Sequence, residues 1–356
     1  MKLSAVRSKR GSRLRHCDLS RCILPFLFLT LGVSNILADG TNAVVLVGSG
    51  SSVPAPLYAR WAQEYDKRNT NIQLRYLPVG TSEGIKQISH GTSDFGAGEV
   101  ELTRQERNDG NLVELPAVLI AIAPVYNLPD VHGEIRLSGD VLALIFLGEI
   151  KNWNAPQIAK LNPEIALPTL PIRVINRPAG KGSNYVFSDY LSKVSSKFRE
   201  QIGVTPSPKW PVGEPAERSS DMADKVKNNL GSIGYVEYQY AVNGHIPVMA
   251  IQNSSGRFIK PSSQSIAAAC TAVEAPRWSN FSVSLTNAIG ADSFPITSFS
   301  WIYVRTSSSD SARAAALSDL LNWIYTDGEP FAVQEGYSEL PSALVTAIKK
   351  KIQDLK

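Results

Sequence analysis

The segment "INRPAGKGSNYVFSDYL", residues 175–191, joins a predicted strand to a predicted helix through a glycine-rich loop. The start of a helix carries unsatisfied backbone N–H groups and a partial positive charge, which suit an oxyanion. The loop is not a nucleotide-binding P-loop, because that motif needs Ser or Thr directly after its lysine, and Lys181 precedes Gly182. The segment therefore predicts an anion site of another kind.

Two further junctions have the same chemistry. "GSGSSVP" at 48–54 and "VGTSEG" at 79–84 also place small residues and hydroxyl groups between a predicted strand and a predicted helix. One such junction is more often an ordinary helix cap. Three of them in one chain favour a shared oxyanion site.

The elements around these junctions alternate between strand and helix. Strands are predicted at 43–50, 72–79, 94–100, 117–128 and 171–176, and helices at 54–68, from about Ile85, at 137–154, at 155–163 and over 318–352. In the first helix, Leu57, Trp61 and Tyr65 recur at helical spacing. The alternation predicts an α/β architecture, and the length of 356 residues favours two domains or lobes.

The charge balance argues against nucleic acid as a partner. The formal net charge is +4, but without residues 1–38 the chain has 29 basic and 31 acidic residues. A global basic field is then absent, so an anion must be held by local geometry.

Residues 1–38 have the pattern of a secretory signal peptide. A basic region precedes the apolar run "CILPFLFLTLGVSNILA", and cleavage is expected near Ala38. A signal anchor remains an alternative. After cleavage only Cys270 is left, so we expect no internal disulfide and no cysteine metal cluster. The histidines also lack metal-ligand spacing, and no metal or other cofactor is expected.

Several motifs in order resemble one family. "GSGSSVPAPLYARWAQEY", "VGTSEGIKQISHGTSDFGAGE", "LGEIKNWN", "NRPAGKGSNYVFSDYL", "GSIGYVEYQYA" and "FPITSFSWIYV" follow the order found in periplasmic phosphate-binding proteins. These are the solute receptors of phosphate-specific ABC transporters. The resemblance runs from about Val44 to the C-terminal helices.

The resemblance implies a two-lobed periplasmic-binding-protein architecture, type II-like, with the ligand in the interlobe cleft. Lobe 1 is expected at 43–122 plus 293–356, and lobe 2 at 123–292. The implied function is capture of inorganic phosphate in the periplasm and delivery to the transmembrane permease subunits of an ABC transporter. We expect a monomer that acts without catalysis.

The resemblance also carries a set of ligand contacts over by position. A hydroxyl and a backbone N–H are expected from Ser52 and Val53, a hydroxyl from Thr81, the site's charge from Arg177, and donors at the third helix start from Gly182 and Ser183. Glu99 stands where the family has an aspartate. A carboxylate there accepts a hydrogen bond from a protonated anion and repels sulfate, which has no proton to donate.

The loop after Arg177 departs from the family pattern. The family commonly has Asp-Gly-Ser-Gly-Thr, whereas this chain has Ala179-Gly180-Lys181-Gly182-Ser183. The sequence leaves three possibilities open for Lys181. It is a solvated loop lysine, it contacts the anion directly, or it pairs with Glu99.

Two other functions remain alternatives. An exported phosphatase would use the same helix starts on a phosphate ester, although no ordered Ser/His/Asp arrangement is visible in the sequence. A stand-alone oxyanion sensor or scavenger with altered anion preference would bind without a permease.

Overall fold

The computed structural model describes residues 43–271, 281 and 283–355. The predicted signal peptide lies outside these residues. The strands are β1 (Val44–Gly50), β2 (Ile72–Leu77), β3 (Phe95–Gly98), β4 (Leu112–Tyr126), β5 (Arg136–Leu137), β6 (Arg173–Asn176), β7 (Glu214–Pro215), β8 (Ser232–Glu237), β9 (Ala250–Gln252), β10 (Phe258–Ile259) and β11 (Thr297–Arg305).

The helices lie between and after these strands. They are α1 (Ala55–Arg68), α2 (Thr81–Ser89), α3 (Arg104–Asp109), α4 (Gly139–Phe146), α5 (Pro156–Ala159), α6 (Gly182–Val194), α7 (Ser196–Gln201), α8 (Ser219–Asn228), α9 (Tyr238–Gly244), α10 (Ser263–Thr271), α11 (Ser311–Ile324), α12 (Glu329–Gln334) and α13 (Ser342–Gln353). The predicted α/β class is confirmed.

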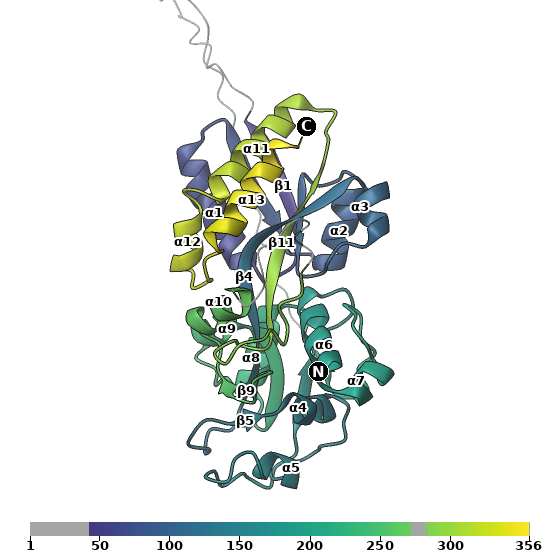
Figure 1. Ribbon diagram of the computed structural model, residues 1–356, viewed down its shortest axis with the longest axis vertical. Coiled ribbons are helices and arrows are strands. Elements are labelled where there is room, and N and C mark those ends of the chain that lie inside the picture. The colour runs from purple at the N-terminus through teal and green to yellow at the C-terminus, as the bar shows by residue number, and fades with distance from the viewer. Residues whose placement is uncertain (1–42, 272–280, 282, 356) are drawn as a thin grey trace, which may run out of the picture. The chain divides into compact units, whose positions relative to one another are not determined.

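One strand links two parts of the main sheet, whose order is β2-β1-β3-β11-β4-β8-β6-β7. Strand β4 pairs antiparallel with β11 as far as Ala121, and from Ile122 onward it pairs antiparallel with β8. Helices α1, α2 and α11 to α13 gather around the first part of β4, and α4 and α6 to α8 around the second (Figure 1). The lobe boundaries at 122/123 and 292/293 stay a prediction.

The apolar residues that predicted helix α1 form its buried face. Leu57, Trp61 and Tyr65 are all buried on one face, and the indole N–H of Trp61 donates to the carbonyl of Gly328 at 2.8 Å. Pro54 precedes the first turn, where a missing N–H costs nothing. This packing fixes the helix start that follows the loop at Ser51 to Val53.

Several predicted helix boundaries were wrong. The helix predicted over 155–163 ends at Ala159, and the C-terminal helices predicted from residue 318 begin at Ser311. Helix α2 begins at Thr81 instead of about Ile85, because Gly80 adopts φ +102° and turns the chain directly into the helix. The helix predicted over 137–154 ends at Phe146, two residues before Gly148 at φ +76°. The earlier start of α2 matters for function, since it places the Thr81 hydroxyl in the first turn.

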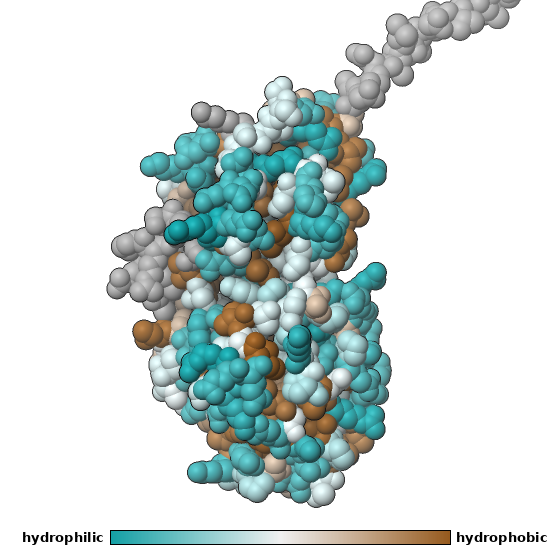
Figure 2. All heavy atoms as spheres, turned by 90° about the vertical axis from the view of Figure 1, so that its right-hand side faces the viewer, coloured by the Kyte–Doolittle hydropathy of each residue, from teal (hydrophilic) through white to brown (hydrophobic). Residues whose placement is uncertain are grey.

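The side of the molecule that carries α2, α3, α6 and α7 is mostly hydrophilic, with scattered apolar side chains (Figure 2). Among the exposed large apolar residues are Leu77, Val79 and Val204. No helix within the described part of the chain is long and apolar enough to cross a membrane.

Candidate functional site

The starts of helices α2 and α6 meet in the structure. The Ser82 N–H donates to the carbonyl of Gly180 at 3.2 Å. A Cβ placed on Gly182 would overlap Oε2 of Glu99 and come within 2.6 Å of the Thr81 hydroxyl. Two of the three junctions singled out in the sequence therefore lie against each other, and only a glycine fits at position 182.

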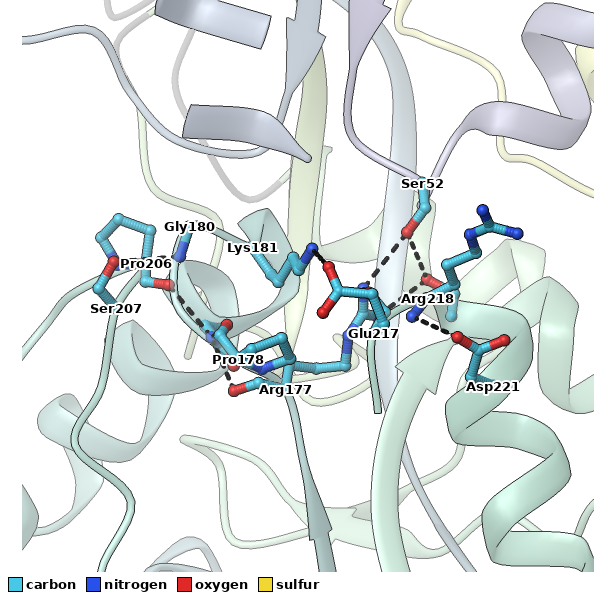
Figure 3. Close-up of polar contacts among 12 residues, drawn as sticks. Ser52, Arg177, Pro178, Gly180, Lys181, Pro206, Ser207, Glu217, Arg218 and Asp221 are labelled. Carbon is cyan, nitrogen blue, oxygen red and sulfur yellow. Dashed lines mark hydrogen bonds and ion pairs between the residues drawn. The ribbon is translucent and has the colours of Figure 1, made fainter. Parts of the chain in front are cut away.

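Arg177 is the central cation of this region. It follows β6, is 1% exposed, and points toward Ser52 (Figure 3). Its Nη1 donates to the Ser219 hydroxyl at 3.1 Å, and its Nη2 donates to the Ser52 hydroxyl at 3.3 Å and the Glu217 carbonyl at 2.9 Å. Burial lowers the pKa of the guanidinium, but a group with an ordinary pKa above 12 stays charged.

No carboxylate of the described residues lies within ion-pair distance of Arg177. Its Nε is buried without a hydrogen-bond partner in the described part of the protein, and so is the hydroxyl of Ser183 at the start of α6. Buried polar groups in native proteins almost always have partners. A buried cation and two unpaired donors are the features expected where an anion binds.

Glu99 supplies an acidic group at the same place. It lies directly after β3, is fully buried, and accepts hydrogen bonds from Thr81 at 3.2 Å and Ser300 at 3.0 Å. Burial raises the pKa of its carboxyl to about 7, against the opposing effects of hydroxyl hydrogen bonds and the charge of Arg177. Near neutral pH this group can therefore either hold a proton or accept one from a ligand.

The raised pKa of Glu99 predicts a pH-dependent stability. Between the ordinary value of 4.5 and about 7, the folded protein keeps a proton that the unfolded chain has released. Unfolding releases that proton, so stability falls as pH rises through this window and levels off above it. The expected loss is on the order of 3 kcal/mol.

This loss is measured by urea unfolding in phosphate-free buffer at pH 5 and pH 8, for the wild type and Glu99→Gln. The wild type should lose more stability than the variant over this range. Glu237, whose pKa burial raises to about 8, acts in the same direction in both proteins. Because the charge of Glu99 adds to the rise in the Glu237 pKa, the difference between the two proteins reports Glu99 together with its coupling to Glu237. Parallel pH profiles would contradict the assignment.

At the first junction, Ser52 and Val53 have different surroundings. The Ser52 hydroxyl lies 3.3 Å from the Ser219 hydroxyl and also accepts from Arg177. The N–H of Val53, expected to face the ligand, donates to the Ser51 hydroxyl at 3.1 Å. Ser52 thus lies beside the cation, while the Val53 N–H is engaged within its own loop.

Lys181 forms an ion pair with Glu217 and not with Glu99 (Figure 3). Its side chain is 12% exposed and that of Glu217 is 67% exposed. The pairing of Lys181 with Glu99, one of the three possibilities open from the sequence, is therefore wrong, and a freely solvated lysine is wrong as well. The partner is 36 residues away along the chain, on the segment before α8.

Sequence reasoning missed four residues around the site. They are Glu217, Ser219, Tyr240 and Ser300. The Tyr240 hydroxyl donates to the Ser52 carbonyl at 2.9 Å. Ser219 opens helix α8 after the short strand β7. It is thus a fourth hydroxyl at a strand-to-helix junction, and this signal was available from the sequence.

Comparisons with known proteins identify the family of the chain. Residues 37–328 match the family model described as the PBP superfamily domain. The chain is 36% identical to the phosphate-binding protein PstS of Haemophilus influenzae, over 92% of this chain and 96% of that protein. It is 35% identical to PstS of Xylella fastidiosa, over 88% of this chain and 86% of the relative.

Solved structures show the fold. A high-affinity periplasmic phosphate-binding protein, PfluDING, matches with a TM-score of 0.70 at 17% identity, covering 86% of this chain and 93% of that one. A phosphate-bound putative phosphate ABC transporter substrate-binding protein from Clostridium perfringens matches with a TM-score of 0.61 at 16% identity, covering 83% and 100%. The predicted two-lobed periplasmic-binding-protein fold is confirmed. The chain belongs to the PBP superfamily and, within it, to the family of PstS phosphate-binding proteins.

Proposed function

We propose that the protein captures inorganic phosphate in the periplasm and delivers it to the membrane permease of an ABC transporter. The observation that carries the proposal is the buried Arg177, which has no carboxylate partner among the described residues and whose Nε, like the Ser183 hydroxyl, has no hydrogen-bond partner there. The curated relatives are phosphate-binding proteins, and this supports phosphate as the anion.

The proposed site holds the anion between charge and hydrogen bonds. Arg177 supplies the counter-charge, and the hydroxyl groups of Ser183 and Ser52 supply donors. The Thr81 hydroxyl, which donates to Glu99 in the structure, turns to the anion when phosphate donates its proton to Glu99 instead. The N-terminus of α6, beginning at Gly182, adds its partial positive charge. Val53 and Lys181 were also expected to contact the ligand. Neither is given a direct contact here, because the Val53 N–H donates to the Ser51 hydroxyl and the Lys181 ammonium pairs with Glu217.

Glu99 makes the site selective. When it is ionised it can only accept hydrogen bonds, so it favours a ligand that still has a proton. Sulfate would place its lone pairs against those of Glu99 in a buried site, where an unpaired acceptor costs roughly 1–3 kcal/mol or more. We therefore expect phosphate and arsenate to bind and sulfate to be rejected.

Calorimetric titration with phosphate, followed by competition with sulfate at pH 8, measures this selectivity. Phosphate should bind at least tenfold more tightly than sulfate, because Glu99 is mostly ionised above its pKa of about 7. The same competition with Glu99→Gln should admit sulfate, since an amide supplies a donor. Sulfate binding within tenfold of phosphate in the wild type would remove the proposed role of Glu99.

We infer that the protein binds without turnover, as a monomer whose lobes lie at 43–122 plus 293–356 and at 123–292. A phosphatase would show sustained release of phosphate from an ester in a colorimetric assay, and this receptor should show none. A sensor or scavenger would bind equally well, and capture of the permease by the phosphate-loaded protein separates transport from that alternative.

A further inference from the structure

Glu217 contacts both cationic side chains of the site. Its main-chain carbonyl accepts a hydrogen bond from Nη2 of Arg177 at 2.9 Å, and its carboxylate forms an ion pair with the ammonium of Lys181 (Figure 3). Glu217 lies between β7 and α8, outside all three glycine-rich junctions. One residue therefore contacts both positive charges.

Lys181 lies at the start of α6 and close to the start of α2. It occupies the N-cap position of α6, but its side chain makes no capping hydrogen bond. Its Cδ and Nζ are 3.6 Å from the position that a Cβ on Gly80 would take, and Gly80 precedes Thr81. The ammonium is thus held between the two helix starts by a carboxylate at the surface.

The pairing sets the charge that the site offers to an anion. Glu217 compensates Lys181, whereas Arg177 has no compensating carboxylate at ion-pair distance in the described residues. We propose that Glu217 is a specificity-determining positioning residue, which keeps the Lys181 ammonium away from the anion so that Arg177 remains the one uncompensated cation there. This inference rests on the proposed function and deepens it.

Loss of the Glu217 carboxylate should change the preference between phosphate and sulfate, and not only weaken the binding of both anions. With 12% of its side chain exposed, Lys181 would be a largely buried ammonium without a partner, which is unfavourable. It gains a partner by turning toward the bound anion. Phosphate and sulfate are both mainly dianions at pH 8, but only phosphate has a proton to donate to Glu99. A second cation beside the anion offsets the repulsion between Glu99 and sulfate, so sulfate gains more affinity than phosphate.

The test compares phosphate and sulfate affinities of the full-length protein by calorimetry at pH 8 and low ionic strength. Glu217→Gln keeps the shape of the side chain and removes its charge. It should raise the sulfate-to-phosphate affinity ratio at least tenfold. The double variant Glu217→Gln with Lys181→Ser should return the ratio to within threefold of the wild type, because the released ammonium is then gone.

Asp292→Asn is a matched control, since it removes the carboxylate of another ion pair, that of Arg257 and Asp292 at 2.6 Å with both side chains more than half exposed. It should leave the ratio unchanged. An unchanged ratio in Glu217→Gln with phosphate binding intact overturns the inference alone. A gain that persists in the double variant also overturns it, because Lys181 is then not the cause. A wild type that fails to bind phosphate overturns the proposed function itself.

Discussion

Arg177→Ala should weaken phosphate binding by roughly 30-fold to several thousand-fold. Removing one partner of a buried, hydrogen-bonded charge pair costs roughly 2–5 kcal/mol, because the remaining charge is left uncompensated. Here that remaining charge is the anion, and Arg177 is its only counter-charge free of a carboxylate among the described residues. Titration calorimetry with phosphate measures the loss.

Arg173→Ala serves as the control, since Arg173 lies on the same strand β6 but is exposed. It should bind phosphate like the wild type. Thermal unfolding without phosphate checks that Arg177→Ala still folds, because the truncation removes three hydrogen bonds and leaves a cavity. A loss in phosphate affinity below threefold for Arg177→Ala would place Arg177 outside the binding site.

Gly182→Ala should weaken phosphate binding by roughly 5-fold to 150-fold through overcrowding, which costs about 1–3 kcal/mol in a well-packed region. The backbone at 182 is helical and accepts alanine, so the effect is steric. The added methyl group would overlap the carboxylate of Glu99 and crowd the Thr81 hydroxyl. Glu99 follows β3 and Thr81 opens α2, so both groups lie across the contact between the starts of α2 and α6. The methyl group would hold these two helix starts apart.

A rescue variant separates this mechanism from general damage. Glu99→Asp shortens the acid by one methylene, and combined with Gly182→Ala it should recover part of the lost affinity. Gly244→Ala is the control, because its methyl group meets only Ile246 at 3.1 Å. If the double variant binds no better than Gly182→Ala alone, the overlap with Glu99 is not the cause.

Local patterns in the sequence predicted the elements and much of the site. A strand-to-helix junction is determined by residues that are close together in the sequence. The starts of α1 and α6 and the buried face of α1 could therefore be predicted from the sequence. The start of α2 was misplaced because the φ of Gly80, and not apolar spacing, decides it. The position of Arg177 was predicted only by resemblance to the family.

The partner of Lys181 could not be predicted from local patterns. Glu217 reaches it because the pairing of β6 with β7 brings the segment before α8 beside the loop that follows β6. Such contacts depend on the arrangement of the sheet, which no short motif encodes. The unpaired donors on Arg177 and Ser183 are likewise properties of burial in three dimensions.

The buried charge of Arg177 links occupancy to the lifetime of the protein. A ligand that binds the folded state alone stabilises it in proportion to the logarithm of its concentration, and here it also neutralises a cation that burial disfavours. The protein without phosphate should therefore unfold more often than the phosphate-bound protein, and proteases should cleave it faster. Phosphate supply would then govern how long each copy survives, without any dedicated regulator.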